Sequence, residues 1–260
     1  EVVDVVERET DGAVVHVLAE PLPPGTVEVR GEVDGARRLD LMQQHTGQHL
    51  LSAAFEEALS AHPEFGMFAC SMRRWDSPEI LENAGIGYRK TLSGFQLARD
   101  RAASEWPRAC EVFGPSGGAA LIRKRVIDDI GLFDEAFFAY NEDVDFALRA
   151  RLAGYRCLYL PEAVVRHREG VTAKRLGARK THLIQRNAEW AMLKNVPAPV
   201  RRRYGLLHAA YIVQQMIRNG RLAPVVWRAR NEARRNPRPA GPPPRISTAE
   251  LSAWLDVSFR

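Results

Sequence analysis

The hydrophobic and polar positions of the chain change their spacing several times. Residues 1–34 alternate between apolar and polar, as in 14–18 and 26–30, with turns where Gly, Pro and Asp cluster. This period of two predicts a small antiparallel β unit. From about residue 40 to 60 the apolar positions follow helical spacing, and His62 and Pro63 end that predicted helix.

The central part alternates short apolar runs with turns. Asn141 is a suitable N-cap for a helix that continues to Ala153, and Gly154 is a suitable stop. Gly131 ends a shorter helix, and Pro161 interrupts an apolar run. The elements expected here are a strand at 65–72, a polar loop to about 108, helices at 126–130 and 142–153, a buried strand at 157–160 and a second extended piece at 163–165.

Beyond His167 the pattern is helical and basic. An apolar helix is expected at 204–217 and an arginine-rich one at 221–235, followed by a proline-rich linker at 236–245. Ser247 and Glu250 form a capping box before a short terminal helix. The fold class predicted is therefore α/β: a mixed sheet with helices, preceded by a small antiparallel β unit and helix, and followed by basic helices.

Composition fits an ordinary folded chain. Of 260 residues, 45% are hydrophobic and 27% charged, which excludes global disorder and a membrane-embedded fold. The three cysteines, at 70, 110 and 157, form no metal-binding or disulfide pattern, so we expect reduced thiols in a cytoplasmic protein. The first residue is Glu rather than Met, which suggests a fragment of a longer protein.

Charge is unevenly distributed along the chain. The net charge is +5, but residues 1–59 hold 12 Asp or Glu against 4 Lys or Arg, whereas residues 174–260 hold 18 Lys or Arg against 4 Asp or Glu. Two interpretations of the basic end remain open. It either contacts an acidic partner, such as the inner face of an anionic membrane, or forms a solvated helical cover on the sheet.

Several side chains that could take part in catalysis or metal binding lie between residues 113 and 167. Glu142, Asp143 and Asp145 fall in the first turn of a predicted helix, where the helix dipole favours negative charge. Such a run is either ordinary helix-start chemistry or a source of a general base. His167 ends an extended segment, where it is either a surface residue or a metal ligand.

The segments GGAALIRK, FDE-FFAY-NEDVD and AVVRH resemble the acceptor-side half of family 2 glycosyltransferases, especially rhamnosyltransferase-like members. The resemblance covers about residues 59–200 and implies a GT-A-like sheet. It implies an inverting single displacement that moves a sugar from a nucleotide-sugar donor to a glycan or cell-envelope acceptor. Asp143 would be the general base and Glu142 its support. His167 would bind Mg²⁺ or Mn²⁺. Two interpretations of Gly114, Ser116, Gly117 and Gly118 remain open: they let the backbone approach an acceptor sugar closely, or they form a turn that connects two strands.

The sequence departs from that family in one respect. The family's nucleotide-binding half, with its Asp-x-Asp metal motif, has no counterpart here, and the one Asp-x-Asp, Asp143 to Asp145, belongs to the base region. We therefore expect transferase activity of this chain alone to be impaired.

The segment DGARRLDLMQQHTGQHLLSAAFE resembles alanyl-tRNA editing proteins, which hydrolyse mischarged tRNA. His45 and His49 are four residues apart, so one helix face would present both imidazoles to a zinc ion. The family's CxxxH element is missing, which makes tight Zn²⁺ binding unexpected. The alternatives are thus an editing hydrolase that acts on tRNA or a non-catalytic fusion fragment. The domain boundaries expected are 1–58, 59–200 and 201–260.

Overall fold

The computed structural model describes residues 2–7, 13–26, 28–29, 55–168 and 176–256, and it divides into two compact units, 1–47 and 48–260. In the first unit, β1 (Val2–Glu7) pairs antiparallel with β2 (Val14–Leu18). The predicted β unit is confirmed to this extent. The helical pattern from 40 to 54 lies outside the described residues, whereas residues 55–61 are helical and end before His62 as predicted.

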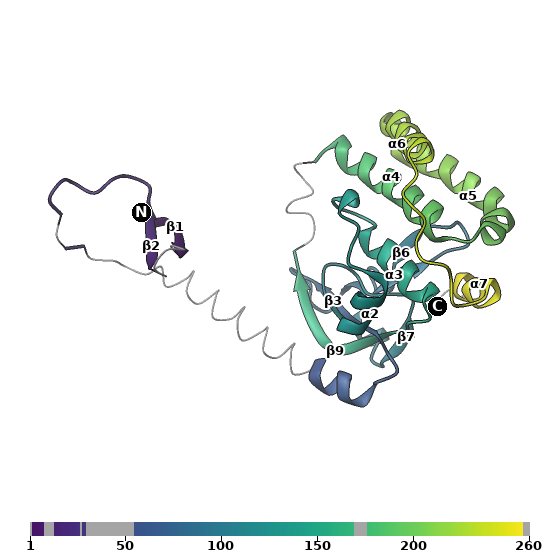
Figure 1. Ribbon diagram of the computed structural model, residues 1–260, viewed down its shortest axis with the longest axis horizontal. Helices are drawn as coiled ribbons and strands as arrows, with labels where there is room; N and C mark the ends of the chain where they lie inside the picture. Colours follow the sequence, from purple (N-terminus) through teal and green to yellow (C-terminus); the bar gives the residue numbers. More distant parts are fainter. Residues whose placement is uncertain (1, 8–12, 27, 30–54, 169–175, 257–260) are drawn as a thin grey trace. The chain divides into compact units, whose positions relative to one another are not determined.

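A mixed sheet is the centre of the second unit (Figure 1). Its middle strand is β3 (Met67–Arg74), which pairs in parallel with β9 (Cys157–His167) along the whole length of β3. Both strands are apolar at their buried ends, because the sheet is covered there on both faces. The shorter strands pair antiparallel at the edges: β4 (Leu81–Asn83) and β8 (Ala120–Ile122) with β3, and β7 (Cys110–Val112) with β9.

Two details of the sheet differ from the sequence prediction. Pro161 does not end β9, because the strand passes through a register shift opposite Cys70 and Ser71 and then resumes pairing at Val164. A bulge of this kind accommodates a residue that cannot donate to the ladder. The predicted loop before residue 108 contains β4 and a hairpin of β5 (Ile86–Tyr88) and β6 (Gly94–Gln96). Strands of three residues are too short to show the alternation of apolar and polar positions by which a strand is predicted from sequence.

Most of the expected helices begin and end close to the expected residues, although the one expected at 204–217 begins at Ala198. Gly131 and Gly154 follow α2 (Lys124–Ile130) and α3 (Glu142–Leu152) with positive φ, as helix stops should. Asn141 precedes α3 but does not cap it, because its backbone is left-handed and its side chain donates to the Ile184 carbonyl. The helices are α2 (Lys124–Ile130), α3 (Glu142–Leu152), α4 (Ala178–Asn195), α5 (Ala198–Asn219), α6 (Ala223–Arg235) and α7 (Thr248–Asp256), with 3-10 turns η1 (Ala103–Glu105), η2 (Glu135–Phe137) and η4 (Gly220–Leu222).

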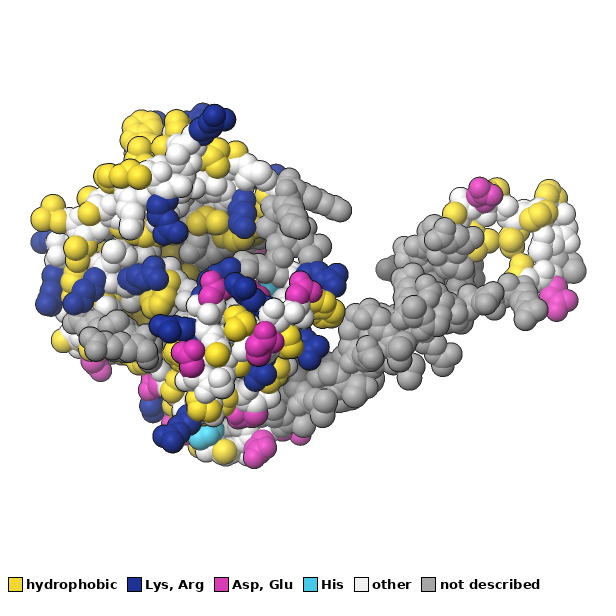
Figure 2. All heavy atoms as spheres, turned by 180° about the vertical axis from the view of Figure 1, so that it is seen from behind, with side chains coloured by type: hydrophobic (Ala, Val, Ile, Leu, Met, Phe, Trp, Pro, Cys, Tyr) yellow, Lys and Arg dark blue, Asp and Glu magenta, His cyan; other side chains and the backbone are white. Residues whose placement is uncertain are grey.

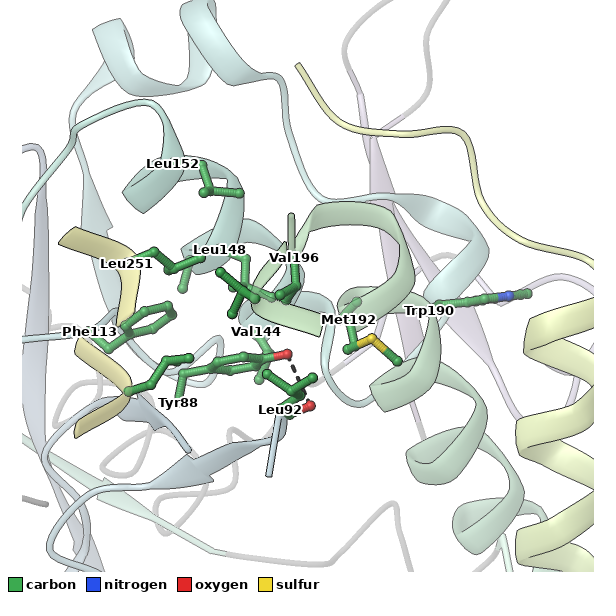
Figure 3. Close-up of a cluster of buried hydrophobic side chains, with 14 of the residues drawn as sticks. Tyr88, Leu92, Phe113, Val144, Leu148, Leu152, Trp190, Met192, Val196 and Leu251 are labelled. Carbon is green, nitrogen blue, oxygen red and sulfur yellow. Dashed lines mark hydrogen bonds between the residues drawn. The ribbon is translucent and has the colours of Figure 1, made fainter. Parts of the chain in front are cut away.

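Helix α3 connects the sheet to the terminal helices. Its residues from Val144 to Leu152 are all buried, so it is covered by protein on every side beyond its first turn. Figure 3 shows the apolar cluster that joins α3 to α4 and α7, with the Tyr88 hydroxyl donating to the Leu92 carbonyl at 3.0 Å. The terminal helices α4, α5 and α6 pack on one another, and Figure 2 shows hydrophobic and basic side chains on the outer surface of this region. Within the described residues, no helix is long and apolar enough to cross a membrane.

Candidate functional site

The glycine turn at 114–118 lies against the start of α3. The Gly117 amide donates to Asp143 Oδ2 at 3.0 Å, and the Val144 amide donates to Asp143 Oδ1 at 2.8 Å. A Cβ at Gly117 would lie 3.4 Å from Asp143 Cβ and 3.5 Å from Glu142 Oε1. The structure thus brings the glycine turn and both carboxylates together, although they are 26 residues apart in sequence.

Gly114 and Gly118 make different contacts from Gly117. A Cβ at Gly114 would collide with Ala147 Cβ, so this glycine allows the turn to approach α3 closely. A Cβ at Gly118 would lie 2.8 Å from Met72 Cε, which places the end of the turn over β3. Ser116 is buried beside Gly118. These two glycines therefore serve the packing of the turn, and Gly117 is the one that faces the carboxylates.

The two carboxylates have unusual surroundings. Burial raises the pKa of Asp143, and the amides of Gly117 and Val144 only partly oppose this. Burial also raises the pKa of Glu142, and the neighbouring Asp143 charge acts in the same direction. Glu142 Oε2 is buried without a hydrogen-bond partner. A carboxylate accepts about four hydrogen bonds, so Asp143 retains free lone pairs after its two amide contacts.

Asp145, the third acid of the run, has a structural role. It is fully buried and accepts hydrogen bonds from Arg149, Lys194 and Asn195 at 2.8–3.1 Å. These contacts fasten α3 to the end of α4. Asp143 and Asp145 therefore have different surroundings, because residues two positions apart on a helix point in different directions.

His167 lies at the end of β9, opposite Arg74 of β3. Its Nδ1 is 2.7 Å from Oε2 of the buried Glu82. A carboxylate on Nδ1 fixes the tautomer in which Nε2 carries a free lone pair, which is the form that binds metals. Within the described chain, no hydrogen bond or ion pair joins His167 to Glu142 or Asp143, and no three acidic, His or Cys side chains form a metal cluster.

Glu82 is the site residue that sequence reasoning missed. It falls in β4, within a stretch that reads as loop, and no motif marks it. Its connection with His167 spans 85 residues, so only the pairing of β4 and β9 with β3 reveals it. His45 and His49, the zinc ligands expected from the upstream resemblance, lie outside the described residues.

Comparison with known proteins identifies the class. The model of the family described as glycosyl transferase family group 2 matches residues 91–226, from the β5–β6 hairpin into α6. This is more than half of the chain, and the chain belongs to this family.

Among individual relatives, the N-acetylglucosaminyl-diphospho-decaprenol L-rhamnosyltransferase of Mycobacterium tuberculosis H37Rv is 42% identical over 52 residues, 20% of this chain and 17% of that enzyme. The alanyl-tRNA editing protein Aarsd1 of Bos taurus is 52% identical over 89 residues, 33% of this chain and 19% of the relative. The alanine--tRNA ligase of Methanocella arvoryzae is 44% identical over 52 residues, 20% of this chain and 6% of the ligase. The chain thus covers less than a fifth of each relative, and both resemblances drawn from the sequence are confirmed.

Proposed function

We propose that this chain supplies the acceptor side of a GT-A-like glycosyltransferase that moves a sugar from a nucleotide-sugar donor to a glycan or cell-envelope acceptor. The observation that carries the proposal is the contact between the Gly117 amide and Asp143 Oδ2. It holds a partly desolvated carboxylate beside Gly117, which has no side chain. Such an arrangement leaves room for a sugar hydroxyl at the carboxylate.

In the proposed reaction Asp143 is the general base. The acceptor hydroxyl donates to a free lone pair of Asp143, which takes the proton as the hydroxyl oxygen attacks the anomeric carbon. The bond to the donor diphosphate breaks on the opposite face, so the configuration inverts. A raised pKa makes Asp143 a stronger base than an ordinary aspartate. Glu142 supports it from the neighbouring position, where its Oε2 is buried without a hydrogen-bond partner.

A divalent cation, Mg²⁺ or Mn²⁺, fits this proposal only with ligands from the donor. His167 Nε2 offers one ligand, and Mg²⁺ sites often combine few protein ligands with substrate phosphates. When bound, the cation would neutralise charge on the departing diphosphate. Glu82 would hold the imidazole in the orientation that leaves Nε2 available.

Transfer assays test the base assignment. Purified protein is incubated with dTDP-rhamnose, UDP-sugars or GDP-sugars, Mn²⁺ or Mg²⁺ and an N-acetylglucosaminyl-diphospho lipid, the acceptor type named for the mycobacterial relative. If this chain alone is impaired, as the sequence predicts, the product forms slowly, and Asp143→Asn abolishes it. Asp128→Asn, at an exposed position of α2 paired with Lys124, is the matched control. Product formation by Asp143→Asn at the rate of the unmodified protein would remove Asp143 as the base.

A second proposal rests on the editing-protein relatives. A zinc-dependent hydrolase that acts on mischarged alanyl-tRNA would use His45 and His49 as two of its ligands. Two imidazoles alone bind zinc weakly, so this activity requires further ligands. Metal analysis of the purified chain decides the matter: stoichiometric zinc that is lost in His49→Ala supports the hydrolase, and a metal-free protein contradicts it.

A further inference from the structure

Helix α5 exposes a stripe of apolar side chains. Leu206, Val213 and Ile217 are 89%, 55% and 75% exposed, and with Ala210 they follow positions i, i+4, i+7 and i+11. At 100° per residue these four lie within about 60° of one another around the helix. The opposite face of α5 is buried through Val200, Tyr204 and His208. The stripe is therefore a second apolar face, beyond the one that the fold uses.

Arginines surround this stripe, and acids are missing from it. Residues 198–222 contain five arginines and no Asp or Glu. In the described part of the chain, none of the arginines around the stripe forms an ion pair: Arg202, Arg203, Arg218, Arg221 and Arg228. Trp227 of α6 adds an aromatic side chain that is 55% exposed. Figure 2 shows hydrophobic and basic side chains interleaved over this region, with few acidic ones.

A polar pocket lies beside the stripe. It has a volume of about 580 Å³ and is bordered by Arg89 and Thr91 of the β5–β6 hairpin and by Tyr211, Gln214 and Arg218 of α5. Gln214 and Arg218 each follow a stripe residue in sequence. The hairpin is fixed against α5, because His208 Nδ1 lies 2.8 Å from the Thr91 carbonyl. The pocket is thus preformed and shares its border with the apolar face.

The pocket brings like charges together without an acid among its lining residues. Burial lowers the pKa of Arg89; Tyr211 opposes this, whereas Arg218 acts in the same direction as burial. The Arg89 guanidinium stacks on the Phe95 ring, 4.1 Å from its centroid, and makes no ion pair in the part of the molecule described. An anion between Arg89 and Arg218 would relieve their repulsion, and phosphate is the anion that arginine binds in a forked geometry.

We propose that α5 lies on the surface of an anionic membrane, with Leu206, Val213 and Ile217 in the interface and a lipid phosphate headgroup between Arg89 and Arg218. The combination of an apolar stripe, unpaired arginines and no acids is that of a helix lying in a membrane interface. The arginines gain no attraction from a neutral lipid surface, but anionic lipid attracts them. Binding should therefore depend on the negative charge of the lipid. This inference is independent of the proposed transfer reaction.

Vesicle co-sedimentation of the full chain tests the proposal. Vesicles of phosphatidylcholine with about one third phosphatidylglycerol should bind the protein at low salt, whereas phosphatidylcholine alone should not. Binding should weaken steeply when salt shortens the screening length from about 30 Å to about 8 Å. Equal binding to both vesicles, or no binding to either, overturns the proposal.

Variants with matched controls separate the two parts of the surface. Arg218→Gln should weaken binding about fivefold, the effect of one basic residue near an anionic surface, and Arg166→Gln, at an exposed position of β9, should not. Val213→Asp should abolish binding, while Leu132→Asp, at a residue 66% exposed outside α5, should not. Circular dichroism establishes that each variant is folded. Calorimetry with inorganic phosphate covers the other source of the anion: phosphate binding that Arg218→Gln removes, in a protein that ignores vesicles, would contradict membrane docking.

Discussion

At the scale of single residues, the two glycines of the turn should respond differently to the same substitution. Gly114→Ala places a Cβ on Ala147 and should lower the free energy of unfolding by about 1–3 kcal/mol, the usual cost of overpacking. Gly117→Ala makes only ordinary contacts and should leave stability unchanged, but its methyl group enters the space beside Asp143 and should raise KM for the acceptor. Urea unfolding and acceptor kinetics measure the two effects. Equal loss of stability in both variants would show that Gly117 is also a packing residue.

The loss of activity at low pH (the acid limb of the pH profile) should reflect protonation of the Asp143 carboxylate. Because its pKa is raised, the carboxylate is protonated, and so unable to accept a proton, up to a higher pH than an ordinary aspartate near 3.9. We expect kcat/KM to rise with pH through that raised value and then level off. Glu142→Gln removes a neighbouring negative charge, which should move the limb to lower pH. A limb that does not move would mean that the two carboxylates are uncoupled.

The structure brings the predicted carboxylates and glycine turn into contact, while their catalytic roles stay predictions. Asp143, Glu142 and the glycine turn could be found because a long family-like segment contains them, and α3 begins where Asn141 suggested. The buried partners of Asp145 lie 49 and 50 residues further on, in α4, and Glu82 lies 85 residues before His167. Contacts of this range depend on the sheet order and helix packing. A local period in the sequence contains no information about them.

At the scale of elements, the terminal helices are joined by one buried carboxylate. Glu189 of α4 accepts hydrogen bonds from Arg230 at 2.6 Å and Arg234 at 2.7 Å on α6, and lies 3.1 Å from His208 Nε2 on α5. Burial alone would raise the pKa of Glu189, but these partners lower it to about 2. The sequence indicated basic helices here, yet it did not indicate that an acid inside them balances the arginines.

Removing that carboxylate should loosen all three helices. Glu189→Gln leaves Arg230 buried without its counter-charge, and such changes typically cost about 3–5 kcal/mol. The control is Glu232→Gln, because Glu232 is more exposed and contacts His182 and Arg186 near the surface. Chemical denaturation should show a large decrease in stability for the first variant and a small one for the second. Comparable decreases would contradict the central role of Glu189.

The Glu189 carboxylate also makes the stability of the protein depend on pH. Its pKa is depressed in the folded protein, so its contribution is fully present above the ordinary value of 4.5 and is lost as pH falls toward about 2. Asp134 behaves alike: burial would raise its pKa, but Arg238 and Lys194 lower it from 3.8 to about 2. We expect the unfolding midpoint to drop between pH 4.5 and 2, less steeply in Glu189→Gln. A midpoint independent of pH over this range would argue against both ion pairs.

At the scale of the whole molecule, the chain combines two units with different family relations. The second unit, residues 48–260, contains the sheet, the candidate site and the terminal helices, and the family match lies entirely within it. Its apolar clusters are built from residues 55–255. The division of the chain at residue 47 comes from its contacts, whereas the boundaries expected at 58 and 200 followed from sequence resemblance and charge; they stay predictions.

Independent stability of the second unit follows from this arrangement. Because the core residues in the described part of this unit all lie at or after Phe55, removal of residues 1–47 should change its free energy of unfolding by no more than about 0.5 kcal/mol, as expected for independent sites. Tryptophan fluorescence measures this cleanly, since all five tryptophans, at 75, 106, 190, 227 and 254, belong to the second unit. The shortened and full chains should give superimposable urea curves. A lower midpoint for the shortened chain would mean that the first unit stabilises the second and that the two act as one folding unit.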